Sequence, residues 1–184
     1  MALVLNGSGI TSANIADGTI VNADINSSAA IAGSKLTGAG KVLQVVSTTK
    51  TDTFSTASTS FTDITGLSVN ITPSSTSSKI LVLVSTNASN TVVREPMAMR
   101  LMRASTAIYV GNSGTQVSAK LRKETTNATA NIAMNHLDSP SSTSSLTYKV
   151  QLLTQVGNTC RVNYEGGGSA DRYASSITLM EIGA

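Results

Sequence analysis

The chain of 184 residues is poor in the residue types on which enzyme and metal chemistry depend. It has one histidine (His136), one cysteine (Cys160), no tryptophan and only 3% aromatic residues. A single cysteine excludes an intrachain disulfide, and one histidine with one cysteine cannot build a nitrogen and sulfur metal site within one chain. The ten acidic residues stand singly along the sequence, so no local carboxylate pair for glycoside hydrolysis is present. We therefore predict a protein that is not an enzyme and that uses neither a cofactor nor a metal.

Long apolar runs are also missing, which limits where the protein can reside. The longest run, Ile80–Val84, is too short to cross a membrane. The first residues lack the basic flank and the apolar stretch of a signal peptide, so we expect assembly in the cytoplasm in which the chain is made. Aromatic residues do not alternate with basic ones in the way that nucleic-acid binding needs. We predict neither membrane insertion nor a nucleic-acid partner.

The abundant residues favour strands. Serine and threonine make up about 28% of the chain, and together with valine and isoleucine they suit β-structure. Segments of this character, separated by turn residues, predict an all-β fold: an antiparallel β-sandwich of the jelly-roll type over residues 41–184. No residue in Ile80–Val84 suits an exposed face, so we expect both faces of that strand to be covered. The expected strands are Val42–Thr48, Phe61–Thr72, Lys79–Thr86, Met97–Arg103, Thr106–Val110, Val117–Glu124, Ala130–Leu137, Ser145–Thr154, Thr159–Tyr164 and Tyr173–Ile182, with Thr53–Ser60 as a connection.

The first forty residues follow a different pattern. An apolar residue recurs there at five-residue steps, with one slip of a residue, among small and polar residues. A period of five matches neither a helix nor a strand, and six apolar side chains alone cannot offset the cost of ordering the backbone. We therefore expect residues 1–40 to be an extended repeat arm that orders against other copies of the chain or a neighbouring protein. The expected interface residues are Ile10, Ile15, Ile20, Ile25, Ile31 and Leu36.

Two parts of the sequence resemble the proteins of bacterial viruses. The arm is similar to repeats near the start of tail-fibre and other virion-surface proteins, especially those of marine bacterial viruses, and the head is similar to the globular heads of such fibres. The head also resembles the tumour-necrosis-factor-type jelly roll, which is commonly a trimer. The resemblance implies a homotrimer at the virion surface. The matching segments are Gly9–Thr11, Asn14–Ile20, Ala23–Ile25 and Gly33–Leu36 in the arm, and Lys79–Val84 and Ser175–Ile182 in the head.

Three functions follow as hypotheses. The first is a non-enzymatic virion structural protein, a short trimeric fibre or spike whose arm anchors it to other virion proteins in the capsid or tail. The second is a capsid decoration or cement protein whose arm lies across neighbouring capsid subunits. The third is an adhesin whose head binds a glycan of the host surface. In the first, the loops Gly111–Gly114 and Gly166–Ser169 are the candidates for host attachment.

Positive charge is concentrated in one stretch of the head. The net charge of the chain is +3, and the stretch from Arg94 to Glu124 holds six cations against two acidic residues. This concentration of positive charge has two interpretations. The cations lie on the solvated faces of neighbouring strands, or they form a patch that faces an acidic partner such as an anionic polysaccharide or another virion protein. The candidate patch residues are Arg94, Arg100, Arg103, Lys120, Arg122 and Lys123.

Overall fold

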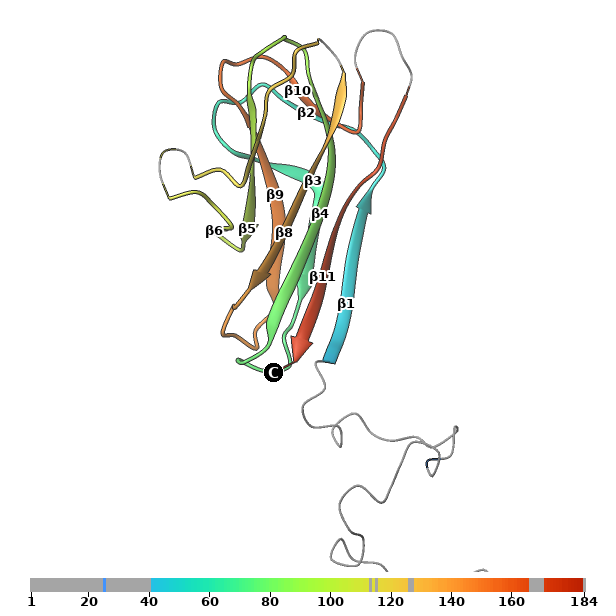
Figure 1. Ribbon diagram of the computed structural model, residues 1–184, viewed down its shortest axis with the longest axis vertical. Coiled ribbons are helices and arrows are strands. Elements are labelled where there is room, and N and C mark those ends of the chain that lie inside the picture. Colours follow the sequence, from blue (N-terminus) through green and yellow to red (C-terminus); the bar gives the residue numbers. More distant parts are fainter. Residues whose placement is uncertain are drawn as a thin grey trace, which may run out of the picture. The chain divides into compact units, whose positions relative to one another are not determined.

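The computed structural model describes residues 25, 41–112, 114, 116–125, 128–165 and 171–183 (Figure 1). The chain divides into two units, Met1–Ala39 and Gly40–Ala184, and the fold below is that of the second. Of the predicted arm residues only Ile25 is described, and its side chain is 40% exposed. The other arm residues and the loop Gly166–Ser169 lie outside the described residues.

The described residues form eleven strands and no helix. Every pairing between them is antiparallel. The strands are β1 (Lys41–Lys50), β2 (Phe54–Thr56), β3 (Thr62–Ile71), β4 (Lys79–Asn90), β5 (Met97–Arg103), β6 (Thr106–Ile108), β7 (Ala119–Leu121), β8 (Thr129–Asp138), β9 (Leu146–Thr154), β10 (Cys160–Val162) and β11 (Ser175–Gly183).

The strands make two sheets that pack face to face. Sheet A has the order β1, β11, β4, β8, and the short strands β10 and β2 extend it beside the far end of β4. Sheet B has the order β3, β9, β5, and β6 and β7 share the outer edge of β5. The pairs β1 with β11, β3 with β9, β4 with β8 and β5 with β7 are nested along the chain, which is the jelly-roll arrangement. The predicted all-β antiparallel sandwich is confirmed.

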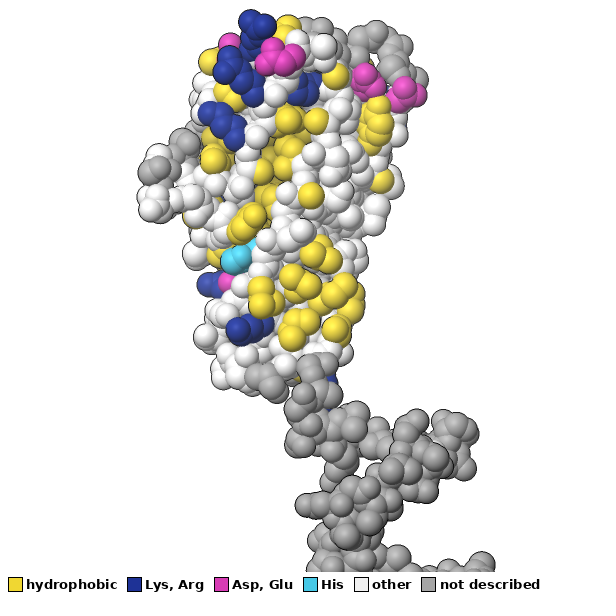
Figure 2. Space-filling view, viewed as in Figure 1, with side chains coloured by type: hydrophobic (Ala, Val, Ile, Leu, Met, Phe, Trp, Pro, Cys, Tyr) yellow, Lys and Arg dark blue, Asp and Glu magenta, His cyan; other side chains and the backbone are white. Residues whose placement is uncertain are grey.

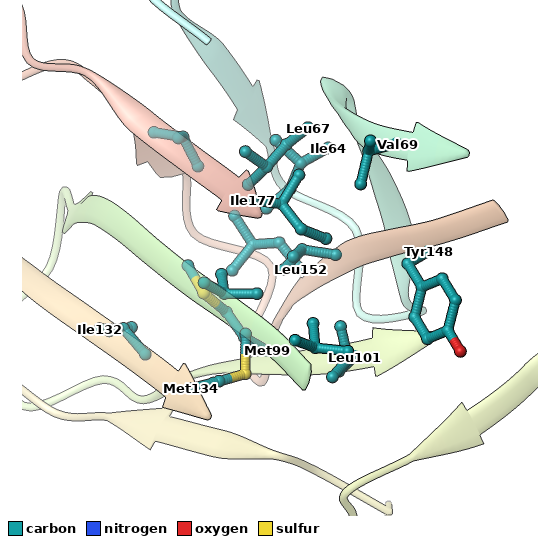
Figure 3. Packing of buried hydrophobic residues seen from close by; sticks show 14 of the residues in the cluster. Ile64, Leu67, Val69, Met99, Leu101, Ile132, Met134, Tyr148, Leu152 and Ile177 are labelled. Atoms are coloured by element: carbon teal, nitrogen blue, oxygen red, sulfur yellow. The ribbon is translucent and has the colours of Figure 1, made fainter. Parts of the chain in front are cut away.

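The core lies between the sheets and is almost entirely aliphatic. Alternation along each strand turns every second side chain inward, as with Ile80, Val82 and Val84 on β4. Methionines on β5 and β8 fill the space that aromatic rings occupy in other cores, and Tyr148 is the one large ring among the buried side chains of the described residues (Figure 3). Each such side chain contributes roughly 1.5–3 kcal/mol when fully buried.

A buried polar network ties the two sheets together near the end of β8. The Arg103 Nη1 atom donates to both carboxylate oxygens of Asp138 at 2.8 and 2.7 Å, and the Tyr148 hydroxyl donates to the same carboxylate at 2.6 Å. Arg103 and Tyr148 belong to sheet B, whereas Asp138 ends β8 of sheet A. Burial of Tyr148 and its hydrogen bond to Asp138 raise the pKa of the tyrosine well above its usual value.

A second buried carboxylate, that of Glu181, joins β11 to β1 and to the turn after β3. The residue is fully buried, and its carboxylate accepts hydrogen bonds from the Gln44 side-chain amide at 2.6 Å and from the Ser74 backbone N–H and hydroxyl at 2.7 and 2.6 Å. Burial by itself would raise the pKa of Glu181, but the donors from Gln44 and Ser74 outweigh it and lower the pKa to about 2. The side chain is therefore ionised at neutral pH and acts as a hydrogen-bond acceptor.

The strands at the two ends of the head lie side by side. β1 pairs with β11 from Lys41 opposite Gly183 to Lys50 opposite Ser175, with one bulge between Val42 and Gln44. The start of β1 and the end of β11 therefore lie at the same end of the sandwich (Figure 1).

Candidate functional site

The two residues with the most reactive side chains lie on different strands, His136 on β8 and Cys160 on β10. The ring of His136 lies 5.3 Å from that of Tyr109, centroid to centroid. Cys160 is fully buried in the core, and burial raises the pKa of its thiol. Within the described ranges, no three residues among His, Cys, Asp and Glu are grouped so that they could hold a metal ion. Those ranges also hold no helix of the length and apolarity that a membrane span requires.

The outer face of sheet A carries a contiguous apolar surface, which we call the apolar face. Its central row crosses four strands in register: Val45 lies opposite Met180, Met180 opposite Leu81, and Leu81 opposite Leu137. Figure 2 shows apolar side chains gathered over the end of the sheet at which β1 begins. The apolar face consists of Val42, Val45, Leu81, Leu83, Leu137, Met180 and Ile182.

The apolar face is unusual for a surface exposed to water. Val42, Val45 and Leu137 are 56%, 54% and 49% exposed, and the charged Lys79 lies at the border of the face, opposite Ile182. On β4, whose two faces were both expected to be covered, the inward face is buried, but the outward Leu81 and Leu83 are only half-buried within one chain. Contiguous apolar surface of this kind marks an interaction site in soluble proteins.

The six predicted patch cations do not share one surface. Arg94, Lys120 and Arg122 are exposed, and Arg94 pairs with Glu124 at 2.9 Å in an ion pair whose side chains are both about 70% exposed. Arg100 and Arg103 are three residues apart on β5, so strand alternation turns them to opposite faces of sheet B. Arg100 lies on the outer face, where it stacks 4.0 Å above the Phe61 ring, whereas Arg103 binds Asp138.

Lys123, the sixth candidate, is buried rather than exposed to solvent. The residue is 8% exposed, and its ammonium group has no hydrogen-bond partner among the described residues. Burial lowers the pKa of Lys123, and the nearby negative charge of Glu165 opposes that shift. Lys123 therefore cannot offer its charge to an outside partner as it stands.

Replacing Lys123 with methionine is expected to raise the free energy of unfolding by about 1 kcal/mol at neutral pH, because an unpaired buried charge is exchanged for an apolar chain of similar length. The folded-state pKa lies below that of the unfolded chain, so the charged lysine destabilises the fold below that pKa. The advantage of Lys123→Met should shrink as the pH rises toward 10.5. Urea denaturation at several pH values measures both effects. Lys120→Met, at an exposed position on β7, is the matched control, and an equal gain there would contradict the explanation.

The outer face of sheet B is polar and has a cavity at a bulge in β3. Asp63 pairs in register with Gln151, and Ser68 pairs with Lys149, so the four residues 64–67 of β3 lie opposite Val150 alone. The bulge includes Gly66 with a φ of 79°, a left-handed conformation that favours glycine. The cavity at this place, which we call the bulge pocket, has a volume of about 390 Å³ and is open to solvent. Its lining residues are Asp63, Ile64, Thr65, Gly66, Ser68, Thr147 and Lys149.

A chain of hydrogen bonds holds the charged groups at the rim of the bulge pocket. The Asp63 carboxylate accepts from the Lys149 ammonium and from the Gln151 side-chain amide, each at 2.7 Å. Gln151 in turn accepts from the Arg100 guanidinium at 2.6 and 3.1 Å. Burial opposes ionisation of Asp63, but the donors Lys149 and Gln151 outweigh it and lower the pKa of its carboxyl.

Sequence reasoning did not single out the bulge pocket, although two signals point to it. Gly66 lies inside a segment of strand character, and isolated glycines in strands mark bulges. The buried residues Ile64 and Leu67 are three positions apart, which breaks the alternation of two that a regular strand requires. These signals locate an irregularity in β3, but only the pairing with β9 brings Thr147 and Lys149 to it.

No family model and no curated protein matches the sequence. Solved structures that are similar include those titled as infectious bursal disease virus Gt strain (15% identity, TM-score 0.42) and the VP2 subviral particle of the same virus (14% identity, TM-score 0.41). A third consists of T=1 particles derived from that virus (16% identity, TM-score 0.42). Each match covers 76% of this chain and 40%, 38% and 37% of the respective solved chain. The chain thus spans about two fifths of the length of the solved chains that it matches.

Proposed function

We propose that the chain is a non-enzymatic virion structural protein, a short homotrimeric fibre or spike on the surface of a bacterial virus. Residues 1–40 form the arm that anchors it to other virion proteins, and residues 41–184 form the head. The observation that carries the proposal is the apolar face of sheet A, which a single chain leaves exposed to water. The viral setting rests on the resemblance of the arm repeats and head strands to fibre proteins.

Association of identical chains would cover the apolar face. Only 12% of all residues are charged, and Lys79, which pairs in register with Ile182, is a charged side chain at the border of the face. The flanking strand β1 has no partner on its outer edge among the described strands, and it carries the exposed Val42, Leu43 and Val45. An edge strand of this kind presents unpaired backbone N–H and C=O groups, which can pair with a strand of a neighbouring chain. Three copies around one axis form a closed assembly in which every copy is covered in the same way.

The mass of the full-length protein in solution tests the proposal. Light scattering should give three times the 18.8 kDa of one chain. Val45→Glu places a charge in the central row of the apolar face and should convert the trimer to monomers, because a buried unpaired carboxylate is costly. Thr49→Glu places the same charge four residues along the same face of β1, beyond the apolar face, and should leave the mass unchanged. A monomeric full-length protein would contradict the trimer.

A truncated chain that starts at Lys41 separates the fibre from its structural alternative. A trimeric truncation assigns assembly to the head and leaves the arm free for anchoring. A truncation that falls to monomers assigns assembly to the arm residues Ile10, Ile15, Ile20, Ile25, Ile31 and Leu36. If both forms are monomers, the arm orders on another protein, and the capsid decoration or cement role takes precedence.

We also propose an acidic partner, with three of the six predicted cations as its contact residues. Of the six predicted cations, Arg94, Lys120 and Arg122 are exposed, so they are the ones that can face an anionic polysaccharide or another virion protein. The adhesin alternative is favoured by one observation, the bulge pocket, which opens on the sheet opposite the apolar face.

A further inference from the structure

The geometry of the bulge pocket points to a binding site for a neutral saccharide, formed by the bulge of β3 and the facing residues of β9. The inference gives the adhesin alternative a site and a ligand class, and it does not depend on the trimer. The volume of the bulge pocket, about 390 Å³, falls within the range of about 300–1,000 Å³ that is typical of small-molecule sites. Bulges are frequent beside binding sites because they redirect side chains out of the regular ladder.

The charges that line the bulge pocket cancel. Its charged groups are the Asp63 carboxylate and the Lys149 ammonium, which are paired at 2.7 Å. An anionic ligand would meet the carboxylate and a cationic ligand would meet the ammonium, so neither gains from the site as a whole. A ligand without net charge meets no such opposition.

The pocket offers both donors and acceptors at close spacing. A carboxylate has about four lone-pair positions, and Asp63 uses two of them for Lys149 and Gln151. The Lys149 ammonium has three N–H groups, and one of them binds Asp63. The hydroxyls of Thr65 and Ser68 can each donate and accept, and the Thr147 hydroxyl, which donates to the Asn70 side chain at 2.7 Å, can still accept. Neighbouring hydroxyls of a sugar ring, which also donate and accept, match this set.

The site is held in place before a ligand arrives. Gln151 and Lys149 fix both oxygens of Asp63, and Arg100 fixes Gln151 from the next strand. Such support lowers the entropy that binding must remove from the side chains. The pocket lies on sheet B, whereas the apolar face lies on the outer face of sheet A, so covering the apolar face leaves the pocket open.

Saturation-transfer NMR on the full-length protein tests the inference with a fixed panel of probes. The panel consists of the methyl glycosides of glucose, galactose, mannose and N-acetylglucosamine, with glucuronic acid as an anionic member. At least one neutral glycoside should receive saturation with an affinity in the millimolar range. Asp63→Ala should weaken that binding about tenfold or more, because it removes a charged acceptor. Lys120→Met, on β7 and outside the pocket, should bind as the unaltered protein does.

Each other outcome overturns the inference. No saturation of any neutral glycoside excludes the site, and equal binding by Asp63→Ala places it elsewhere. Binding of glucuronic acid alone would mean that Lys149 acts as an anion site. Circular dichroism of Asp63→Ala verifies that the variant is folded. The same titration on Val45→Glu separates this inference from the proposed assembly, since saccharide binding should persist when the trimer is lost.

Discussion

Arg103→Met is expected to lower the free energy of unfolding by about 3 kcal/mol, because it leaves the buried Asp138 carboxylate without its cation. The Asp138 side chain is 8% exposed, so water cannot replace the two hydrogen bonds that Arg103 donates. Tyr148 would remain as a donor, but a single hydroxyl does not neutralise a charge. Because the pair connects β5 of sheet B with β8 of sheet A, the loss should appear as one cooperative shift of the denaturant midpoint.

The matched control for Arg103→Met is Arg94→Met. It removes the same side chain from the pair with Glu124, which is similar in length but lies in solvent. Exposed pairs contribute about 0–1 kcal/mol, so the control should stay close to the unaltered protein. Equal losses of unfolding free energy in the two variants would contradict the prediction, because they would show that burial between the sheets does not make the Arg103–Asp138 pair more stabilising than an exposed pair.

Glu181→Gln is expected to lower the free energy of unfolding by about 2 kcal/mol at neutral pH, because a charged acceptor of three hydrogen bonds becomes a neutral amide. The new amide also brings N–H groups toward the donors of Gln44 and Ser74, which leaves one donor without an acceptor. Thermal or denaturant unfolding at pH 7 measures the loss.

The pH dependence of unfolding gives the Glu181 prediction a second, independent readout. The pKa of this carboxyl is about 2 in the fold and near 4.5 when unfolded, so the unfolded chain binds its proton first as the pH falls. The contribution of Glu181 is therefore complete above pH 4.5 and is lost as the pH falls toward 2. Glu181→Gln should flatten this part of the stability profile. A variant whose acid profile matches that of the unaltered protein would contradict the assignment.

Much of the fold could be predicted from local signals. The strand Met97–Arg103 is confirmed with the same bounds. The apolar run Ile80–Val84 also lies in a strand, but it shows no alternation in the sequence, so only the structure shows which of its side chains point inward. The strand β2 was missed, because three residues within the expected connection Thr53–Ser60 are too few to show a period. It becomes a strand only by pairing with β10.

The candidate sites were harder to predict because they depend on residues distant in the sequence. The apolar face needs the register of four strands, and no local pattern brings Val45 beside Met180. The six cations looked like one patch because they are close in sequence, but alternation separates Arg100 from Arg103, and burial removes Lys123. Glu181 and Ser74 lie 107 positions apart, so their hydrogen bonds have no signature in the sequence.

The pairing of the first strand with the last determines how the head responds to mechanical force. Hydrogen bonds in an antiparallel pair run perpendicular to the strands. A pull on Lys41 directed away from Gly183 would therefore break the hydrogen bonds of the β1–β11 ladder one after another, beginning at Lys41. A pull on Lys41 along β1, resisted at the opposite end of the sandwich, would load the whole ladder from Lys41 to Lys50 at once. The head should be weak to a force that pulls Lys41 away from Gly183 and strong to one directed along β1, which is the direction of tension in the fibre that we propose.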